Sequence, residues 1–137
     1  MNYLKIFIIP VFIGLTGMAV SVVPVTAAEV PAAKSDKALV VFYRVKSLKG
    51  GAIGFNVKQG EAAIGVLANG SMFYRHVEPG QHTFWSQVIS QDAVTLDVEA
   101  GKTYYVEGIT LIGLVVARPQ LRQVDESQAK AAIANIN

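Results

Sequence analysis

The feature that most constrains the fold is a series of short apolar runs, separated by turn signals about every eight to twelve residues. The runs are rich in Val, Ile, Phe and Tyr, which favour β-strands. The segments between them carry Gly, Asn or Pro, which favour turns. Crossover helices, which a parallel α/β fold requires, are lacking between the runs. The pattern therefore predicts an all-β fold, an antiparallel β-sandwich or small barrel of about seven or eight short strands.

The strand candidates can be placed from the apolar runs and from the alternation of side chains. The first, at 38–45, is apolar on both faces until Arg44, which predicts a central or doubly covered strand. Asn69-Gly70 predicts a hairpin with a type I′ turn, and Pro79-Gly80 predicts another turn. The further candidates are 55–58, 62–67, 72–77, 82–88, 94–99, 103–107 and 111–117, which Pro119 would end, with an edge strand at 120–124.

The last residues change from a strand period to a helical one. Ala129, Ala132, Ile133 and Ile136 recur at helical spacing. Asp125 or Ser127, which precede them, can cap a helix start. We expect the sandwich domain to cover 38–126 and a short C-terminal helix to cover 127–137.

The first 28 residues have the order of a secretory signal peptide. Lys5 supplies the positive start, 6–23 are apolar, and small residues lead to Ala27 and Ala28. Cleavage after either alanine fits, and we expect a periplasmic or secreted protein with a flexible leader at 29–37. An uncleaved N-terminal helix remains an alternative, because an apolar run of about 18 residues reaches the lower limit for crossing a bilayer.

Composition narrows the function classes further. The chain has no cysteine, so it cannot form disulfides or carry the lipid-modified cysteine of a bacterial lipoprotein. Removal of Lys5 with the signal takes one charge from the 12 basic residues, which then nearly balance the 10 acidic ones. A near-neutral exported domain is not typical of nucleic-acid binding, and we expect no nucleic-acid partner.

Several short motifs occur in an order that resembles a known bacterial family. They are ALVVFYR at 38–44, Ile64-Gly65, NGSMF at 69–73, EPGQHT at 78–83, EAGKTYYV at 99–106 and ARPQL at 117–121. This series is similar to the family catalogued as domain of unknown function 2846, over about 38–126. The Pro-Gly-x-His-Thr element is also loosely similar to PEGA-type β domains. The resemblance implies an envelope-associated β domain without established chemistry, often a lipoprotein, from which this chain departs by lacking the cysteine.

The two histidines invite a metal-binding interpretation. His76, Glu78 and His82 lie close together in sequence, and a periplasmic metal-binding or hydrolytic protein is one alternative. If Pro79-Gly80 form a tight hairpin, however, the two imidazoles emerge on opposite faces. We therefore expect structural histidines, no metal and no cofactor.

Signatures of covalent catalysis are lacking from the sequence. The chain has no cysteine and no Gly-x-Ser-x-Gly elbow. Asp97 and Glu99 share a strand face, which is also the usual pattern of the wet face of a half-buried strand. We accordingly expect a protein that is not an enzyme.

Two features favour binding. Trp85 follows Phe84 in one strand, so one of the two aromatic rings can face outward toward a glycan or peptide, unless the strand is buried on both faces. The segment 109–117 is unusually apolar and is either a partner or membrane-surface patch, or a central strand or hairpin over the core. The candidate contact residues are Trp85, Ile109, Leu111, Ile112, Leu114 and Arg118.

The sequence thus favours a non-enzymatic exported envelope protein, an accessory or binding module of unknown ligand. An envelope protein or a glycan is the expected kind of partner. Membrane contact is expected only through an uncleaved N-terminal segment, which would make the chain an inner-membrane-anchored β domain.

Overall fold

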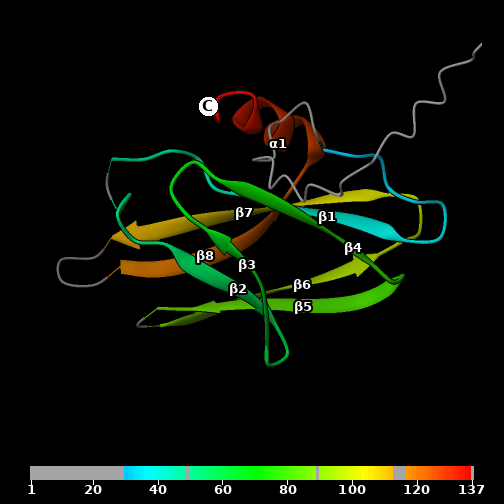
Figure 1. Cartoon of the computed structure of the whole chain (residues 1–137), viewed down its shortest axis with the longest axis horizontal. Helices are drawn as coiled ribbons and strands as arrows, with labels where there is room; N and C mark the ends of the chain where they lie inside the picture. The colour runs from blue at the N-terminus through cyan, green and yellow to red at the C-terminus, as the bar shows by residue number, and fades with distance from the viewer. Residues whose placement is uncertain (1–29, 49, 89, 113–116, 137) are drawn as a thin grey trace, which may run out of the picture.

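The computed structural model of the chain describes residues 30–48, 50–88, 90–112 and 117–136. Within these ranges the chain forms eight strands and one helix (Figure 1). The predicted signal segment, Glu29 and Leu114 lie outside the described residues. The elements are β1 (Ala38–Tyr43), β2 (Phe55–Gln59), β3 (Ala62–Leu67), β4 (Met72–Val77), β5 (Gly80–Gln87), β6 (Gln91–Val98), β7 (Thr103–Ile112), β8 (Ala117–Val124) and α1 (Glu126–Ile133).

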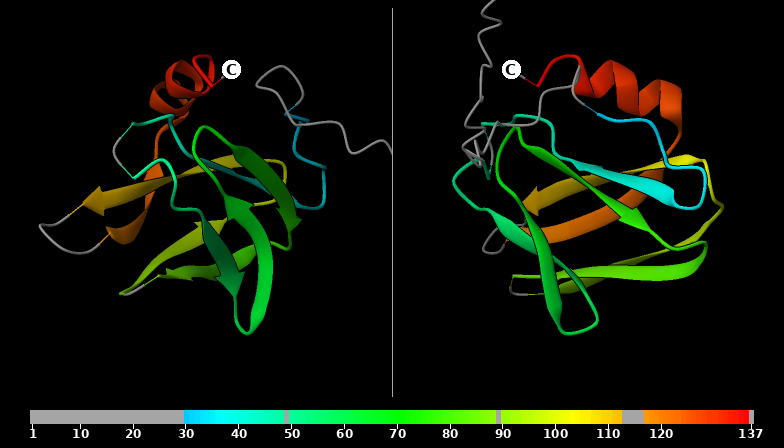
Figure 2. Two further views of the ribbon diagram at one scale, coloured as in Figure 1. Left: turned by 60° about the vertical axis from the view of Figure 1, so that its left-hand side comes forward. Right: turned by 45° about the vertical axis from the view of Figure 1, so that its right-hand side comes forward.

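The strands form two four-stranded sheets that pack face to face. Sheet A has the order β4-β1-β7-β8 and sheet B has the order β3-β2-β5-β6. In both views of Figure 2, α1 lies on the side of sheet A that faces away from sheet B. All strand pairs are antiparallel except β1 and β7, which run parallel. The predicted all-β sandwich with a short C-terminal helix is confirmed.

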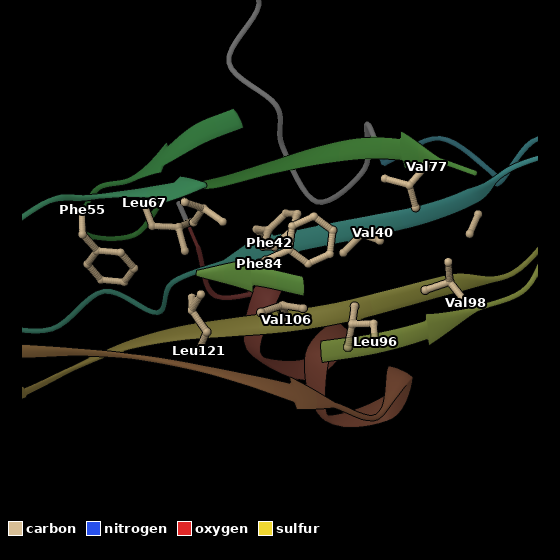
Figure 3. Close-up of a cluster of buried hydrophobic side chains, with 12 residues drawn as sticks. Val40, Phe42, Phe55, Leu67, Val77, Phe84, Leu96, Val98, Val106 and Leu121 are labelled. Carbon is tan, nitrogen blue, oxygen red and sulfur yellow. The ribbon is translucent and has the colours of Figure 1, made fainter. Parts of the chain in front are cut away.

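The main core lies between the two sheets (Figure 3). Phe42 of β1 stacks on Phe73 of β4 with 4.8 Å between ring centroids, and meets Phe84 of β5 edge-on at 5.0 Å. Such offset and edge-on aromatic pairs add to the free energy gained by burying the rings. The other buried members are Ala38, Val40, Phe55, Val57, Leu67, Val77, Leu96, Val98, Val106 and Leu121.

The central position predicted for the first strand is confirmed. All six residues of β1 are buried. Val40 and Phe42 point between the sheets, whereas Leu39 and Val41 point outward into a second cluster with Ala129 and Ile133 of α1. β1 is therefore apolar on both faces because one face meets sheet B and the other meets the helix.

Of the two predicted caps, Asp125 caps the C-terminal helix, which begins at Glu126, one residue earlier than predicted. The Asp125 carboxylate accepts a hydrogen bond from the backbone N–H of Gln128 at 2.7 Å, which caps α1 and lowers the pKa of that carboxyl group. The helix ends at Ile133, earlier than predicted. Val30 and Ala33 of the predicted leader pack against the same outer cluster.

The predicted hairpin at Asn69-Gly70 is wrong, because the chain changes sheet there. β3 belongs to sheet B and β4 to sheet A, so Asn69-Gly70 connects the sheets. Only Gly70 has a positive φ there, 65°, which excludes a type I′ turn. Phe73 explains the choice, since it stacks on Phe42 of β1 while its ring lies against Gly65 of β3. The connection before Gly80 likewise passes from sheet A to sheet B.

The prediction for 111–117 is also wrong as a single strand. β7 continues to Ile112, and β8 begins at Ala117 and pairs with it in an antiparallel hairpin. Pro119 lies within β8 and does not end it. Leu121, two residues after Pro119, directs its backbone N–H to the same side of β8, away from β7. This N–H donates a hydrogen bond to the Asp92 carboxylate at 2.7 Å. Proline fits at this edge because it has no N–H to leave unpaired.

The connections between strands gather at two opposite ends of the sandwich. The loop end, on the left in Figure 1, carries the described parts of the β1–β2 connection (44–48 and 50–54), the connection at 68–71, the end of β5 and the paired ends of β7 and β8 at Ile112 and Ala117. The turn end carries 78–79 and 99–102. Within the described ranges, α1 included, no helix is long and apolar enough to cross a membrane.

Candidate functional site

The structure does not bring the predicted contact residues together. Phe84 points into the core, so Trp85 points to the outer face of sheet B. Val106 points into the same core from β7, which places Ile109 and Leu111 on the outer face of sheet A. Trp85 and the β7–β8 hairpin therefore lie on opposite faces of the sandwich.

Trp85 is half-buried by its own sheet. Its indole N–H donates a hydrogen bond to the carbonyl of Gly60 at 2.8 Å, and the Lys58 ammonium lies 4.9 Å from the ring centroid. β5 is not buried on both faces, since Thr83 and Gln87 next to this tryptophan are exposed. The polar edge of the indole is thus already used within the protein, and sheet packing accounts for the residue.

The apolar hairpin segment presents a different environment. Ile109 is half-buried, Leu111 is 47% exposed, and Arg118 is exposed beside Leu111 as its strand partner. Ile112 ends β7, but its side chain is not among those described. The outer face of sheet A is covered by α1 at Leu39 and Val41, and the exposed hairpin residues lie toward the loop end.

The loop end also gathers exposed apolar side chains that the sequence did not single out. Leu48 is fully exposed in the β1–β2 connection, and Val45 in the same connection is 40% exposed. Val88 follows β5, and Val66 lies near the end of β3. With Leu111, these are all the large exposed apolar side chains of the described residues.

A hollow of about 300 Å³ opens among these loops. Its volume is at the lower limit of small-molecule sites. The Thr110 hydroxyl in its wall is buried without a hydrogen-bond partner among the described residues. Residues that line it are Arg44, Val45, Lys46, Ser47, Glu107, Gly108, Ile109 and Thr110.

Arg44 holds the loops around this hollow in place. Its side chain is buried, and its guanidinium donates hydrogen bonds to three backbone carbonyls: Gly50 at 2.8 Å, Leu67 at 3.1 Å and Ile53. The guanidinium also lies 5.4 Å from the ring centroid of Phe55. Burial lowers the pKa of Arg44, but the carbonyls compensate the charge and tie the β1–β2 connection to the end of β3.

Glu107 is engaged with neighbouring strands of sheet A. Its carboxylate accepts hydrogen bonds from Arg122 at 2.9 Å and from the Tyr43 hydroxyl at 3.4 Å. Burial, with the nearby Glu107 charge and this hydrogen bond, raises the pKa of Tyr43 to about 12. The carboxylate therefore lies between two protein donors.

The two histidines occupy separate environments. His76 lies on the outer face of sheet A opposite Leu39, edge-on to Tyr74. His82 is in sheet B, where the Gln59 amide lies 2.7 Å from its Nδ1 and the Glu78 carbonyl lies 2.6 Å from its Nε2. A neutral ring protonated on Nε2 satisfies both contacts. Among the described residues, no three His, Asp or Glu side chains converge as metal ligands.

A second hollow, of about 440 Å³, lies beneath the C-terminal helix. It is bounded by 30–32 on one side and by Thr103, Tyr105 and Ile133 on the other. Glu126 and Lys130, which pair at 2.8 Å on α1, form its rim. The charges at this rim are therefore already matched.

Sequence reasoning found one part of the loop end and missed the rest. The apolar run at 109–117 pointed to Leu111, but Val66 and Val88 lie in ordinary strand candidates, and no apolar run marks Leu48. Leu48 stands between Ser47 and Lys49 in a glycine-containing loop. A large apolar residue within such a polar loop is the signal that could have found it.

Comparison with known proteins gives a family match and a curated relative. The model of the family described as protein of unknown function (DUF2846) matches residues 34–118. A protein of Haemophilus influenzae described as uncharacterized is 31% identical over 75 residues, which cover 54% of this chain and 45% of that protein. The matched part thus spans less than half the length of that relative. Because the family model matches more than half of the chain, the protein belongs to the DUF2846 family.

Proposed function

We propose that this chain is a non-enzymatic exported binding module of the cell envelope, and that it contacts its partner through the loop end. The N-terminal sequence, with Lys5, the apolar run at 6–23 and Ala27-Ala28, supports export. The sandwich supplies a rigid frame, and loops carried on such a frame are a common place for binding sites.

The observation that carries the proposal is the gathering of exposed apolar side chains at one end. Val45 and Leu48 come from the β1–β2 connection, Val88 from the β5–β6 connection and Leu111 from the end of β7, and all four lie at the same end of the sandwich. Large apolar side chains that remain exposed to water on neighbouring loops and strand ends are typical of an interaction surface.

The polar groups near the hollow support binding over catalysis. Arg44 is held by backbone carbonyls, and Glu107 is held by Arg122 and Tyr43. A catalytic acid, base or nucleophile needs to be directed at a substrate. These groups instead direct their hydrogen bonds at the protein.

Cell fractionation tests the proposal. We expect the exported protein to remain with the envelope fraction, and we expect Leu48→Ser combined with Leu111→Ser to shift at least half of it into the soluble fraction. Both residues are exposed, so this double variant should keep the wild-type unfolding midpoint.

The control changes an exposed residue at the turn end. Lys102→Ser should leave the distribution unchanged, because it lies opposite the proposed contact. A double variant that stays with the envelope as completely as this control would contradict the loop-end contact. N-terminal sequencing of the exported chain distinguishes cleavage after Ala27 or Ala28 from an uncleaved anchor.

A further inference from the structure

The exposed charges of the loop end are biased toward one sign. Lys46 follows Val45 in the β1–β2 connection, and Arg118 lies next to Leu111 across the β7–β8 hairpin. Both are exposed, and neither forms an ion pair with the described residues. These two cations are therefore available to an external anion.

The two acidic side chains nearest these cations, Glu107 and Asp92, are partly shielded by the protein. Glu107 is only 13% exposed and pairs with Arg122, while Asp92 is half-buried and keeps its negative charge, with its carboxylate accepting the backbone N–H of Leu121. The β1–β2 connection at 44–54 contains no acidic residue. The loop end thus presents positive charge beside apolar side chains.

The turn end has the opposite character. Lys37 pairs with Glu78 at 3.4 Å, and Lys102 pairs with Glu99. None of the large exposed apolar side chains lies there. Of the two ends, only the loop end combines net positive charge with exposed apolar side chains among the residues that the structure describes.

We propose that the loop end docks on an anionic phospholipid surface. Leu48 and Leu111 enter the interface between head groups and acyl chains, and Lys46 and Arg118 contact the phosphates. Apolar side chains for the interface and cations for the lipid phosphates are the two components of peripheral membrane binding. The inference rests on the proposed envelope function and deepens it by naming the class of partner.

The shape of the surface favours a lipid over a protein partner. Leu48 projects fully into solvent, Val88 projects from the β5–β6 connection, and Leu111 projects from the end of β7. A protein would need a matched pocket for each separate side chain, whereas a fluid lipid interface accommodates all of them without one. Electrostatic attraction by an anionic surface would orient this end toward the bilayer.

The absence of cysteine allows a site-specific test. We would place a single cysteine at Leu48 or, as the matched control, at Lys102, and label it with an environment-sensitive fluorophore. The exported protein would then be mixed with vesicles of phosphatidylcholine, with and without phosphatidylglycerol. A label at each end reports which end meets the lipid, even if another segment also binds.

We expect the Leu48 label to shift to the blue with phosphatidylglycerol vesicles only, and the Lys102 label to remain as in water. Lys46→Glu with Arg118→Glu should weaken vesicle binding about tenfold or more, because it replaces two cations by anions. A Leu48 label that does not shift, or that shifts equally on neutral vesicles, overturns the inference. So does an equal response of the Lys102 label.

The fractionation experiment separates this failure from failure of the proposed function. In one outcome, the emission of the Leu48 label stays unchanged with vesicles while Leu48→Ser with Leu111→Ser still releases the protein from the envelope. In that case the partner is a protein or glycan. If the label ignores vesicles and the double variant stays with the envelope, both proposals fail.

Discussion

The two ends of the sandwich are built by the same strands but differ in their exposed side chains, which are paired charges at one end and apolar groups at the other. At the turn end, the connections at 78–79 and 99–102 are short, and their charges are paired with each other or with Lys37. At the loop end, the long connection at 44–54 leaves Val45 and Leu48 in water. The charges of the turn end are paired within the described part of the chain, whereas the loop end exposes large apolar side chains to water.

The loop end is nevertheless firmly constructed. Arg44 ties its longest connection to β3 through hydrogen bonds to backbone carbonyls. A rigid base carrying exposed side chains loses less conformational entropy on binding than a flexible loop does. The two ends therefore differ in whether their exposed side chains are paired within the described residues, and the proposed contact rests on this difference.

The largest expected effect comes from removing the anchor of the loop end. Arg44→Met should lower the free energy of unfolding by about 3 kcal/mol, because the carbonyls it serves lose their donors in a buried place. Urea unfolding measures this change. Arg118→Met is the matched control, since that arginine is exposed and should have little effect. Equal losses in the two variants would refute the anchoring role.

A smaller loss is expected at the wall between β7 and the core. In Gly108→Ala, the added methyl would lie 2.5 Å from Leu67 and 3.0 Å from Phe55, both buried. Overpacking of this kind should cost about 2 kcal/mol. Gly54→Ala provides the control, because its nearest atom would be 3.8 Å away. Urea unfolding of both should show a loss for Gly108→Ala only.

Tyr43, which donates a hydrogen bond to Glu107, should make the free energy of unfolding depend on alkaline pH. The folded state raises the pKa of Tyr43 to about 12, so it holds the proton more tightly than the unfolded chain. Its contribution is complete below the ordinary tyrosine pKa of about 10 and is lost as the pH rises toward 12. Tyr105, whose pKa burial also raises, acts in the same direction.

Urea midpoints between pH 8 and pH 12 measure this alkaline loss. Tyr43→Phe removes one ionisable group, so its midpoint should fall less steeply over this range than that of the wild type. Parallel curves for the two proteins would show that Tyr43 does not contribute to the alkaline loss.

The smallest effect is expected at the turn end. In the native protein, a hydrogen bond from Lys102 lowers the pKa of Glu99. Glu99→Gln removes this ionic partner of Lys102. Both side chains are well exposed, so water and salt screen the pair. The urea midpoint should not change beyond the scatter of repeats. A clear loss would mean that the two ends depend on their polar contacts to a similar degree.

The strands were predictable because the alternation and the turn residues are local signals. The both-faced apolar character of 38–43 predicted a doubly covered strand, and β1 is one. Asn69-Gly70 misled because the same dipeptide serves a connection between sheets, and only the stacking of Phe73 on Phe42 decides the pairing. Pairing partners depend on contacts between distant residues, which local periodicity does not contain.

The site was predictable only in part, for the same reason. Leu111 and Arg118 were identified from an apolar run and its flank, but their grouping with Leu48 and Lys46 depends on the parallel pairing of β1 with β7. Trp85 was offered as a contact residue, yet it lies on the other face, with its N–H bonded to Gly60. Residue type suggested binding at both places, and the topology separates them.

The central claim is that the loop end contacts the envelope and the turn end does not. In-cell photocrosslinking tests it most directly, with a benzophenone amino acid placed at Leu48 or, as the control, at Glu99. Both positions are exposed, so neither substitution should disturb the fold. The account predicts protein or lipid adducts from position 48 and none from position 99. Adducts from 99 alone, equal adducts from both, or none from either would contradict it.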